Sequence, residues 1–516
     1  MRERHPNAAV AATRGEAVAD VTGGVWRDPV AWTIASLAFL AYFALSLFRL
    51  LQLDPASWDL GIYTEYVKQL SLLHAPIVDV RGPGFNLLGD HFQVALAVLA
   101  PFFRVFPSPA TLLFFQALLV AVSVFPVMSA ASALAGRSSG RLIGFAYGFS
   151  WGLQQMIVFD FHEIALAVPL LAFSLSALVR GRPRAAALWA LPLVFVKEDQ
   201  GFTVAAIGLL LIVAGLCPGW IPGLQRLRGH AGFGFFLFVW GLGWSVLAIT
   251  VIIPHFNAAH DYYYFKDGGV VGGGPPFAVV GLAKQAFDGY SVKLVTVALL
   301  LLPTAFAALG SPVALLALPS LLLRFISTNT AYWGTDWHYN ATIMPILFIA
   351  AVEAISRWRD LAAGPRRPIT WTYRIFRIFS DTWRSVRFGL ARHGAPMMAA
   401  VAVALAFQFP ISNLWHASTY QLDPHISAAD AAMAVVPDGA TAATTLDLLA
   451  PLAARTDTFW MGNAGNPLTT YVVFDGQNSG YSLGKTKVPA FIKQLYPTAG
   501  YVQIFSRDDV YVFQRP

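Results

Sequence analysis

The sequence predicts an all-α polytopic membrane bundle of about eleven transmembrane helices, followed by a small C-terminal extracytoplasmic α/β domain. Of the 516 residues, 56% are hydrophobic and only 12% are charged, which is about half the charged fraction of an ordinary soluble domain. Apolar runs of roughly 20 residues, each long enough to cross a bilayer as a helix, recur as far as position 415. After that position the long apolar runs stop, which places the domain boundary there.

The positive charge of the chain does not indicate nucleic-acid binding. The formal net charge is +7, but the excess is arginine-rich and lies in short loops, as the positive-inside rule expects for a membrane protein. Cys217 is the single cysteine, so an intrachain disulfide is excluded. The tail over 1–28 is polar, so we expect no cleavable signal peptide and a first helix that stays as an anchor.

Arginine clusters predict which loops face the cytoplasm. Two loops on the same side must be separated by an even number of crossings. "FDFHE" (159–163) and "KEDQG" (197–201) each interrupt an apolar stretch between two such clusters, so each is predicted to be the outer tip of a two-helix hairpin. Gln200 and Gly201 are typical of a turn. The predicted cytoplasmic segments are the N-terminal tail over 1–28, three short loops at 136–141, 180–184 and 225–230, and a basic loop over 357–395.

The remaining elements follow from the same frame. A long first outer loop (52–92) follows the first helix, and the stretch 93–106 is expected to be an interfacial or re-entrant helix because Pro101 and Arg104 interrupt it. Two further outer loops are expected at 255–276 and 327–340. Together with the two hairpins above, the crossings of this membrane domain (29–415) are predicted at 29–51, 109–135, 231–254, 293–327 (a hairpin with its inner tip at 310–312), 341–357 and 396–415.

The C-terminal segment, 416–516, reads as a soluble domain on the outer face. "ISAADAAMAVVP" is typical of a helix, "TTYVVFD" and "GYVQIF" of strands, and "SRDD" of a hairpin turn before "VYVFQ". The segment contains no catalytic motif that we identify. We therefore expect a structural or substrate-gating cap.

Most of the unusual ionisable residues fall in the predicted outer loops, whereas the inner loops carry mainly arginine. Such a division predicts one polar site at the outer membrane boundary, built from several loops. Its acidic and histidine candidates are Asp59, Asp90, His91, Asp160, His162, Glu163, Glu198, Asp199 and His338, and its cationic candidates are Arg81, Lys197 and Arg324.

Each group also has a structural interpretation. Asp59, with Ser57, is placed to cap a helix, and Asp90 precedes another helix in the same way. Asp160, His162 and Glu163 are either a metal corner or a set of hydrogen bonds between helices. The residues 197–199 carry charges of both signs, so they are alternatively a self-neutralising turn.

Six motifs in order then resemble a known family. "WDLGIYTEYV", "GDHF", "LLFFQALLVAVSVFPV", "FDFHEIALAVPLLAF", "VKEDQG" and "DWHYNATIMPIL" resemble the domain of unknown function 2079 family of polytopic bacterial membrane proteins. Its layout is similar to that of the GT-C superfamily of glycosyltransferases, which take a sugar from a polyprenyl-phosphate donor at the outer face. The resemblance implies that Asp59 corresponds to the acidic residue of their first outer loop. The loop reads "WDLG", however, and lacks the paired acidic motif of many members.

The resemblance implies roles for the other candidates, and the chemistry of their side chains fits them. Asp59 is expected to be the general base, with Arg81, Lys197 or Arg324 facing the lipid phosphate and Trp58, Trp337 and Tyr339 stacking on the sugar. A divalent metal is a further possibility. The expected partners are membrane lipid, a lipid-linked sugar donor and a glycan or lipid acceptor, without nucleic acid. The expected location is the bacterial plasma membrane, with the N-terminus in the cytoplasm.

Two other classes of function fit the sequence less well. A transporter or flippase also carries intramembrane charges and helices interrupted by Gly or Pro, but no internal repeat relates the two halves of this chain. A non-catalytic scaffold that presents the C-terminal domain has no need for so many ionisable residues on one face. A single outward cavity with a lateral lipid groove favours a transferase, whereas a midplane pocket between two similar bundles favours transport.

Overall fold

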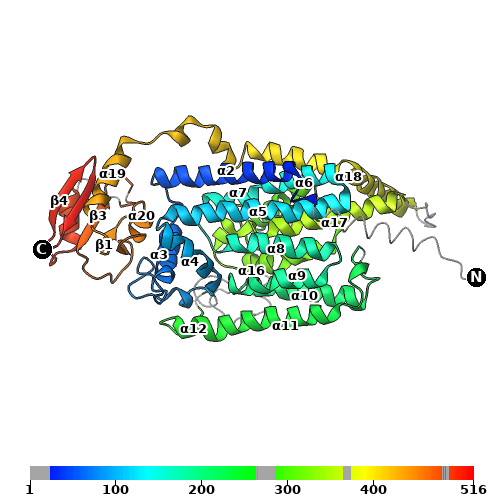
Figure 1. Ribbon diagram of the computed structural model, residues 1–516, viewed down its shortest axis with the longest axis horizontal. Coiled ribbons are helices and arrows are strands. Elements are labelled where there is room, and N and C mark those ends of the chain that lie inside the picture. The colour runs from blue at the N-terminus through cyan, green and yellow to red at the C-terminus, as the bar shows by residue number, and fades with distance from the viewer. Residues whose placement is uncertain are drawn as a thin grey trace, which may run out of the picture.

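The computed structural model describes residues 24–516, apart from 222, 263, 265–284, 364–373, 479, 482 and 484–486. Side chains are not described for 374–382 either. Helices run side by side in an elongated bundle, and a small sheet lies beyond one end of it (Figure 1). The predicted tail, the outer loop over 255–276 and the basic loop over 357–395 lie partly outside the described residues.

Among the described residues, five helices are long and apolar enough to cross a membrane: Pro29–Leu51, Pro109–Ala135, Ala231–Phe256, His338–Ala363 and Trp383–Ala406. The first two are α2 and α5, and both have the bounds that the apolar runs predicted. Asp28 and Ser108 cap them, each followed by proline, which suits the first position of a helix. The third is made of α11 (Ala231–Leu247), a π-helical segment (Ala248–Ile252) and α12 (Ile253–Phe256).

The other apolar helices are shorter than a full crossing, so the count of eleven is not established. Helices η2 (Val94–Leu99) and α4 (Ala100–Val105) form one such short stretch, as expected for a segment that does not cross. The remaining apolar ones include α8 (Ile164–Val179), α9 with η3 (Pro183–Phe195), α10 (Gln200–Leu216), α15 (Tyr290–Leu301) and α16 (Leu318–Phe325). Helices α6 (Arg137–Gly148) and α7 (Trp151–Val158) are also short.

The last two long helices differ in part from the prediction. Helix α17 (Ile343–Ala363) extends past the predicted end at 357. Helix α18 (Arg374–Ala406) begins inside the predicted basic loop, and a separate 3-10 helix, Pro410–Trp415, follows it. The crossing predicted over 396–415 is therefore wrong in its bounds, because the arginines before it continue the helix and Pro410 begins a new element.

The arginine-rich loops meet at one end of the bundle. Asp28 accepts hydrogen bonds from Arg141 Nη2 at 3.0 Å and from Arg137 Nε at 3.2 Å. Arg359 donates to the backbone carbonyl of Ala135, and Arg357 to that of Gly310. The tip at 310–312, which carries no positive charge of its own, therefore lies at the arginine-rich end.

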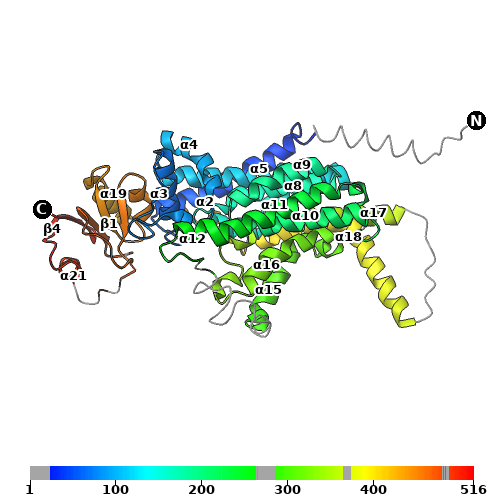
Figure 2. The same cartoon turned by 90° about the horizontal axis from the view of Figure 1, so that it is seen from below.

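The predicted outer tips meet at the opposite end. Residues 159–163 form the turn between α7 and α8, and 197–199 form the turn between η3 and α10. Helix α3 (Asp59–Ser71) and helices α4 and α12 lie at this end, next to the C-terminal sheet (Figures 1 and 2).

The C-terminal domain is a five-stranded mixed sheet with helices. The strand order is β2-β1-β3-β5-β4, with β1 parallel to β2 and β3 and with β5 antiparallel to β3 and β4. Asp508 and Asp509 both have positive φ between β4 and β5, which fits a type I′ turn and confirms the hairpin predicted from "SRDD". The elements are α19 (Pro424–Val435), β1 (Thr441–Thr444), α20 (Leu449–Ala453), β2 (Asp457–Trp460), β3 (Tyr471–Asp475), α21 (Val488–Leu495), β4 (Val502–Arg507) and β5 (Val510–Gln514).

This domain packs directly on the first outer loop. Leu449 of α20 lies so close to Gly61 of α3 that a Cβ atom at position 61 would be 2.9 Å from it. Lys68 Nζ donates to the carbonyl of Thr456 at 2.6 Å. The domain therefore fixes the position of α3, the helix that begins with Asp59.

Candidate active site

A cavity of about 510 Å³ opens at the end of the bundle where the predicted outer tips meet. Helix α3, residues 81–93, the two hairpin tips, α16 and residues 332–342 contribute to its walls. Twelve of the sequence-predicted site residues line it: Trp58, Asp59, Arg81, Asp90, His91, His162, Lys197, Glu198, Asp199, Arg324, His338 and Tyr339. Asp160, Glu163 and Trp337 are not in its wall.

Asp59 is the first residue of α3 and is not its cap. The capping position belongs to Trp58, which makes no side-chain capping bond. The Asp59 carboxylate instead accepts a hydrogen bond from the Ser57 hydroxyl and lines the cavity. The helix thus leaves this carboxylate available to a ligand.

Asp160 holds the turn in front of Asp59. Its carboxylate accepts the backbone N–H groups of Ala56 and Ser57, each at 3.0 Å. Burial raises the pKa of Asp160 to about 6, against the lowering effect of these two bonds. Its φ of +56° places it in the left-handed region at the hairpin tip. Asp160 therefore positions the Asp59 turn and lies outside the cavity wall.

Glu163 lies behind the cavity wall in a buried ion pair. Lys197 Nζ is 2.9 Å from Glu163 Oε1, and the Tyr63 hydroxyl donates to Glu163 Oε2. Burial raises the pKa of Glu163, but Lys197, His162 and His91 together outweigh it and hold that pKa well below its usual range. Burial likewise lowers the pKa of Lys197, and Glu163 and its acidic neighbours raise it well above the usual range. Both groups are charged at neutral pH.

The rings of two histidines lie in contact, tilted relative to each other, near this pair and Asp59. The ring centroids of His162 and His338 are 3.7 Å apart. His162 Nε2 faces Asp59 Oδ2 at 3.7 Å, beyond hydrogen-bond distance. Within the described part of the chain, neither His162 Nε2 nor His338 Nδ1 has a hydrogen-bond partner, although both are buried. These two ring nitrogens are therefore available to a ligand or a water molecule.

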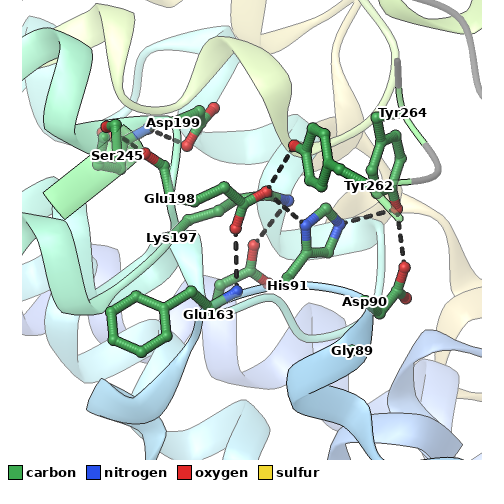
Figure 3. Close-up of polar contacts among 12 residues, drawn as sticks. Gly89, Asp90, His91, Glu163, Lys197, Glu198, Asp199, Ser245, Tyr262 and Tyr264 are labelled. Atoms are coloured by element: carbon green, nitrogen blue, oxygen red, sulfur yellow. Dashed lines mark hydrogen bonds and ion pairs between the residues drawn. The ribbon is translucent and has the colours of Figure 1, made fainter. Parts of the chain in front are cut away.

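A second network surrounds Glu198, as Figure 3 shows. Glu198 Oε1 accepts from Tyr262 at 2.9 Å and lies 2.7 Å from His91 Nδ1, while its Oε2 accepts the Phe92 backbone N–H at 3.0 Å. Tyr264 bridges His91 Nε2 and Asp90. Burial raises the pKa of Glu198, but His91 and Lys197 outweigh it and hold the value at about 2. Beyond the charge interactions within 197–199 expected of a self-neutralising turn, Lys197 and Glu198 also pair with residues of other loops.

The three predicted phosphate-binding cations differ in their neighbours. Lys197 is paired with Glu163, and Arg81 Nε lies 3.6 Å from Asp90 Oδ2. Arg324 is buried, and no carboxylate of the described residues lies within ion-pair distance of it. Its guanidinium donates to the backbone carbonyls of residues 332, 334 and 339 and to the side chain of Asn340, which leaves one N–H of Nη2 without an acceptor among the described residues.

Of the three aromatic candidates, two line the cavity and one does not. Trp58 and Tyr339 line the cavity, whereas Trp337 packs edge-on against Phe159, with ring centroids 4.2 Å apart. Sequence reasoning missed four tyrosines, Tyr63, Tyr262, Tyr264 and Tyr332, which line the cavity. Tyr63 was detectable, because it lies four residues after Asp59 and hence on the same face of the helix. The others come from loops whose paths the sequence does not fix.

A metal centre is not evident in the described residues. No group of three or more His, Cys, Asp or Glu side chains among them is arranged to hold an ion. The predicted metal corner at 160–163 does not form, since Asp160 faces the turn before α3 and Glu163 faces Lys197.

The chain is a membrane protein by its family, and its fold is similar to that of a GT-C glycosyltransferase. It is similar to ArnT from Cupriavidus metallidurans, solved with undecaprenyl phosphate bound, at 14% sequence identity and a TM-score of 0.53, over 93% of this chain and 97% of that one. The chain belongs to the DUF2079 family of predicted membrane proteins, whose model matches residues 49–472.

Two other comparisons add less. The oligosaccharyltransferase of Archaeoglobus fulgidus, solved with zinc and sulfate, is similar over 93% of this chain and 73% of that one, at 12% identity and a TM-score of 0.41, too low to define a fold. No curated protein sequence matches the chain.

Proposed function

We propose that the protein is a membrane glycosyltransferase, which moves a sugar from a polyprenyl-phosphate donor to an acceptor at the outer face of the bacterial plasma membrane. The observation that carries this proposal is a single cavity lined by a carboxylate without a close cationic partner, Asp59, and by a guanidinium without a carboxylate partner, Arg324, among the described residues. The fold shared with ArnT, which binds undecaprenyl phosphate, supports the choice of donor.

The chemistry assigns one task to each of these charges. Asp59 accepts the proton of the acceptor hydroxyl while that oxygen attacks the anomeric carbon. The bond from the anomeric carbon to the phosphate oxygen breaks, and the lipid phosphate leaves with the electron pair. Arg324 stabilises the negative charge that develops on the leaving phosphate. Lys197 and Arg81 contribute less, because Glu163 and Asp90 already offset their charges.

The position of the cavity supports a transferase over a transporter. It lies at one end of the bundle, next to the C-terminal domain, with the arginine-rich loops at the other end. By the positive-inside rule the arginine-rich end faces the cytoplasm, so the cavity and the C-terminal domain face the outside. Transfer at that face needs a site open to one side only.

The test is an assay of the full-length protein in lipid nanodiscs with a panel of undecaprenyl-phosphate sugars and candidate glycan or lipid acceptors. We expect one donor to release undecaprenyl phosphate together with formation of a glycosylated acceptor. Movement of an intact lipid-linked sugar between leaflets of proteoliposomes, without cleavage of the sugar–phosphate bond, would overturn the proposal in favour of transport.

A further inference from the structure

A second cavity, of about 320 Å³, lies near the arginine-rich end of the bundle, away from the candidate active site. Residues just before α2, together with α5, α8 and α9, form its walls. The walls are largely aromatic: Trp26 stacks on Phe125 at 4.3 Å and Phe173 on Trp189 at 4.5 Å. Trp26 and Trp189 are 45% and 41% exposed, so the aromatic rim is open to the surroundings of the bundle.

Some polar groups of the residues that line this cavity have no hydrogen-bond partner among the described residues. Arg180 donates from Nη1 to the Ser129 hydroxyl at 2.9 Å and from Nε to the Ser176 carbonyl at 3.1 Å. For Arg180 Nη2 the described residues provide no acceptor. The Ser176 hydroxyl is buried, with the residue only 1% exposed, and it also lacks a hydrogen-bond partner in the described part of the chain. The Arg180 guanidinium therefore keeps N–H groups without an acceptor at the wall of a mostly apolar cavity, and an unpaired buried hydroxyl belongs to another wall residue.

The charge of the cavity is of one sign. Arg180 and Arg182 both line it, and none of the described carboxylates does. Burial and the charge of Arg182 lower the pKa of Arg180 to about 10, which leaves its guanidinium charged at neutral pH. The contrast with Arg137 and Arg141 at the same end is direct, since both of those pair with Asp28. Two neighbouring half-buried cations without a carboxylate partner in the described part of the chain favour the binding of an anion.

We propose that this cavity binds the phosphate headgroup of an anionic membrane phospholipid. Arginine forks match the oxygens of a phosphate group, and the Ser176 hydroxyl provides a further donor. The aromatic rim, carried on helices of a membrane bundle, suits the glycerol and upper acyl chain of a lipid better than a free ion. The site is separate from the proposed donor site, so it does not depend on the proposed transfer reaction.

The test is native mass spectrometry of the detergent-solubilised full chain titrated with dioleoylphosphatidylglycerol. We expect the wild type to bind this lipid more tightly than dioleoylglycerol, which lacks the phosphate. The double variant Arg180→Gln/Arg182→Gln should lose about tenfold or more of that affinity, since two charge-assisted hydrogen-bonding groups are removed. Ala185→Trp should have a similar effect, because it fills the cavity and leaves both arginines in place.

Arg184→Gln is the matched control. Arg184 lies two residues from Arg182 and is exposed outside the cavity wall, so its loss should leave the affinity unchanged, and thermal unfolding of each variant verifies the fold. Equal binding of the two lipids, or equal loss in Arg184→Gln, overturns the proposal. Binding of inorganic phosphate that depends on Arg180 and Arg182, without binding of the lipid, shows a soluble anion site and overturns the assignment to a lipid.

Discussion

Asp59 and Glu198 line the same cavity, but their carboxylates differ in how many hydrogen bonds they accept from the protein. The Asp59 carboxylate accepts one side-chain hydrogen bond, from Ser57, and faces His162 at 3.7 Å. Glu198 is sealed, because His91, Tyr262 and the Phe92 backbone N–H occupy both of its oxygens. A carboxylate with free acceptor capacity is suited to take a proton, whereas a saturated one holds loops together. One side of the cavity is therefore expected to be reactive and the other structural.

The largest expected effect follows from Asp59→Asn. The amide keeps the size of the side chain but cannot act as a base, so the rate of transfer should fall by about 10² to 10⁴-fold. Thermal stability should stay close to that of the wild type, because the group is not saturated by the fold. The measurement is the rate of undecaprenyl-phosphate release together with a melting curve. A variant with the wild-type rate contradicts the assignment of the base.

Glu198→Gln should affect stability more than chemistry. The substitution leaves His91 without the carboxylate that compensates its charge in a buried setting, and breaking such a pair costs about 3 kcal/mol of unfolding free energy. Donor affinity should fall only as far as the loops around residue 91 loosen. Melting curves and binding isotherms for this variant and for Asp59→Asn separate the effect on stability from the effect on transfer. A Glu198→Gln protein that is stable but inactive would mean that the Glu198 side of the cavity is the reactive one.

The ion pair of Glu198 and His91 predicts the pH range in which it stabilises the fold. The pKa of Glu198 is about 2, below the ordinary 4.5, so its stabilising effect is complete above 4.5 and is lost as the pH falls from there toward 2. Burial lowers the pKa of His91, but Glu198 raises it above the ordinary 6.5, so that contribution is complete below 6.5 and is lost at higher pH. The stability difference between wild type and Glu198→Gln should be largest between pH 4.5 and 6.5 and should shrink on either side.

Gly61→Ala tests whether the C-terminal domain holds α3, and with it Asp59, in position. A Cβ atom at position 61 would be 2.9 Å from the Leu449 side chain, so α20 or α3 must shift, at a cost of roughly 1 to 3 kcal/mol. Because α3 begins at Asp59, activity should fall severalfold with little change in donor affinity. The double variant Gly61→Ala/Leu449→Ala, which makes room again, should recover activity. No recovery would mean that the domain does not position Asp59.

Sequence reasoning reached the general plan of the site but not its pairings. Parity between arginine loops brought the tips at 159–163 and 197–199 to one end of the bundle, where the structure has them. It did not predict that Lys197 pairs with Glu163 or Glu198 with His91, because these contacts join residues that are distant in the chain. The role of Asp160 was also hidden, since a carboxylate that caps backbone N–H groups resembles one that lines a cavity when only the sequence is seen.

The smallest expected effect comes from Tyr264→Phe, on the structural side of the cavity that contains Glu198. The hydroxyl of Tyr264 bonds to His91 Nε2 at 2.8 Å and to Asp90 Oδ1 at 3.3 Å, so its loss should cost about 1 kcal/mol of stability. The rate of transfer should stay within a few-fold of the wild type, because Glu198 still holds His91. Tyr63→Phe is the matched change on the other side, where the hydroxyl donates to Glu163, behind Asp59. If Tyr264→Phe reduced the rate as strongly as Asp59→Asn, the hydrogen-bond network around Glu198 would have to take part in the chemistry. The distinction between a reactive and a structural side of the cavity would then be wrong.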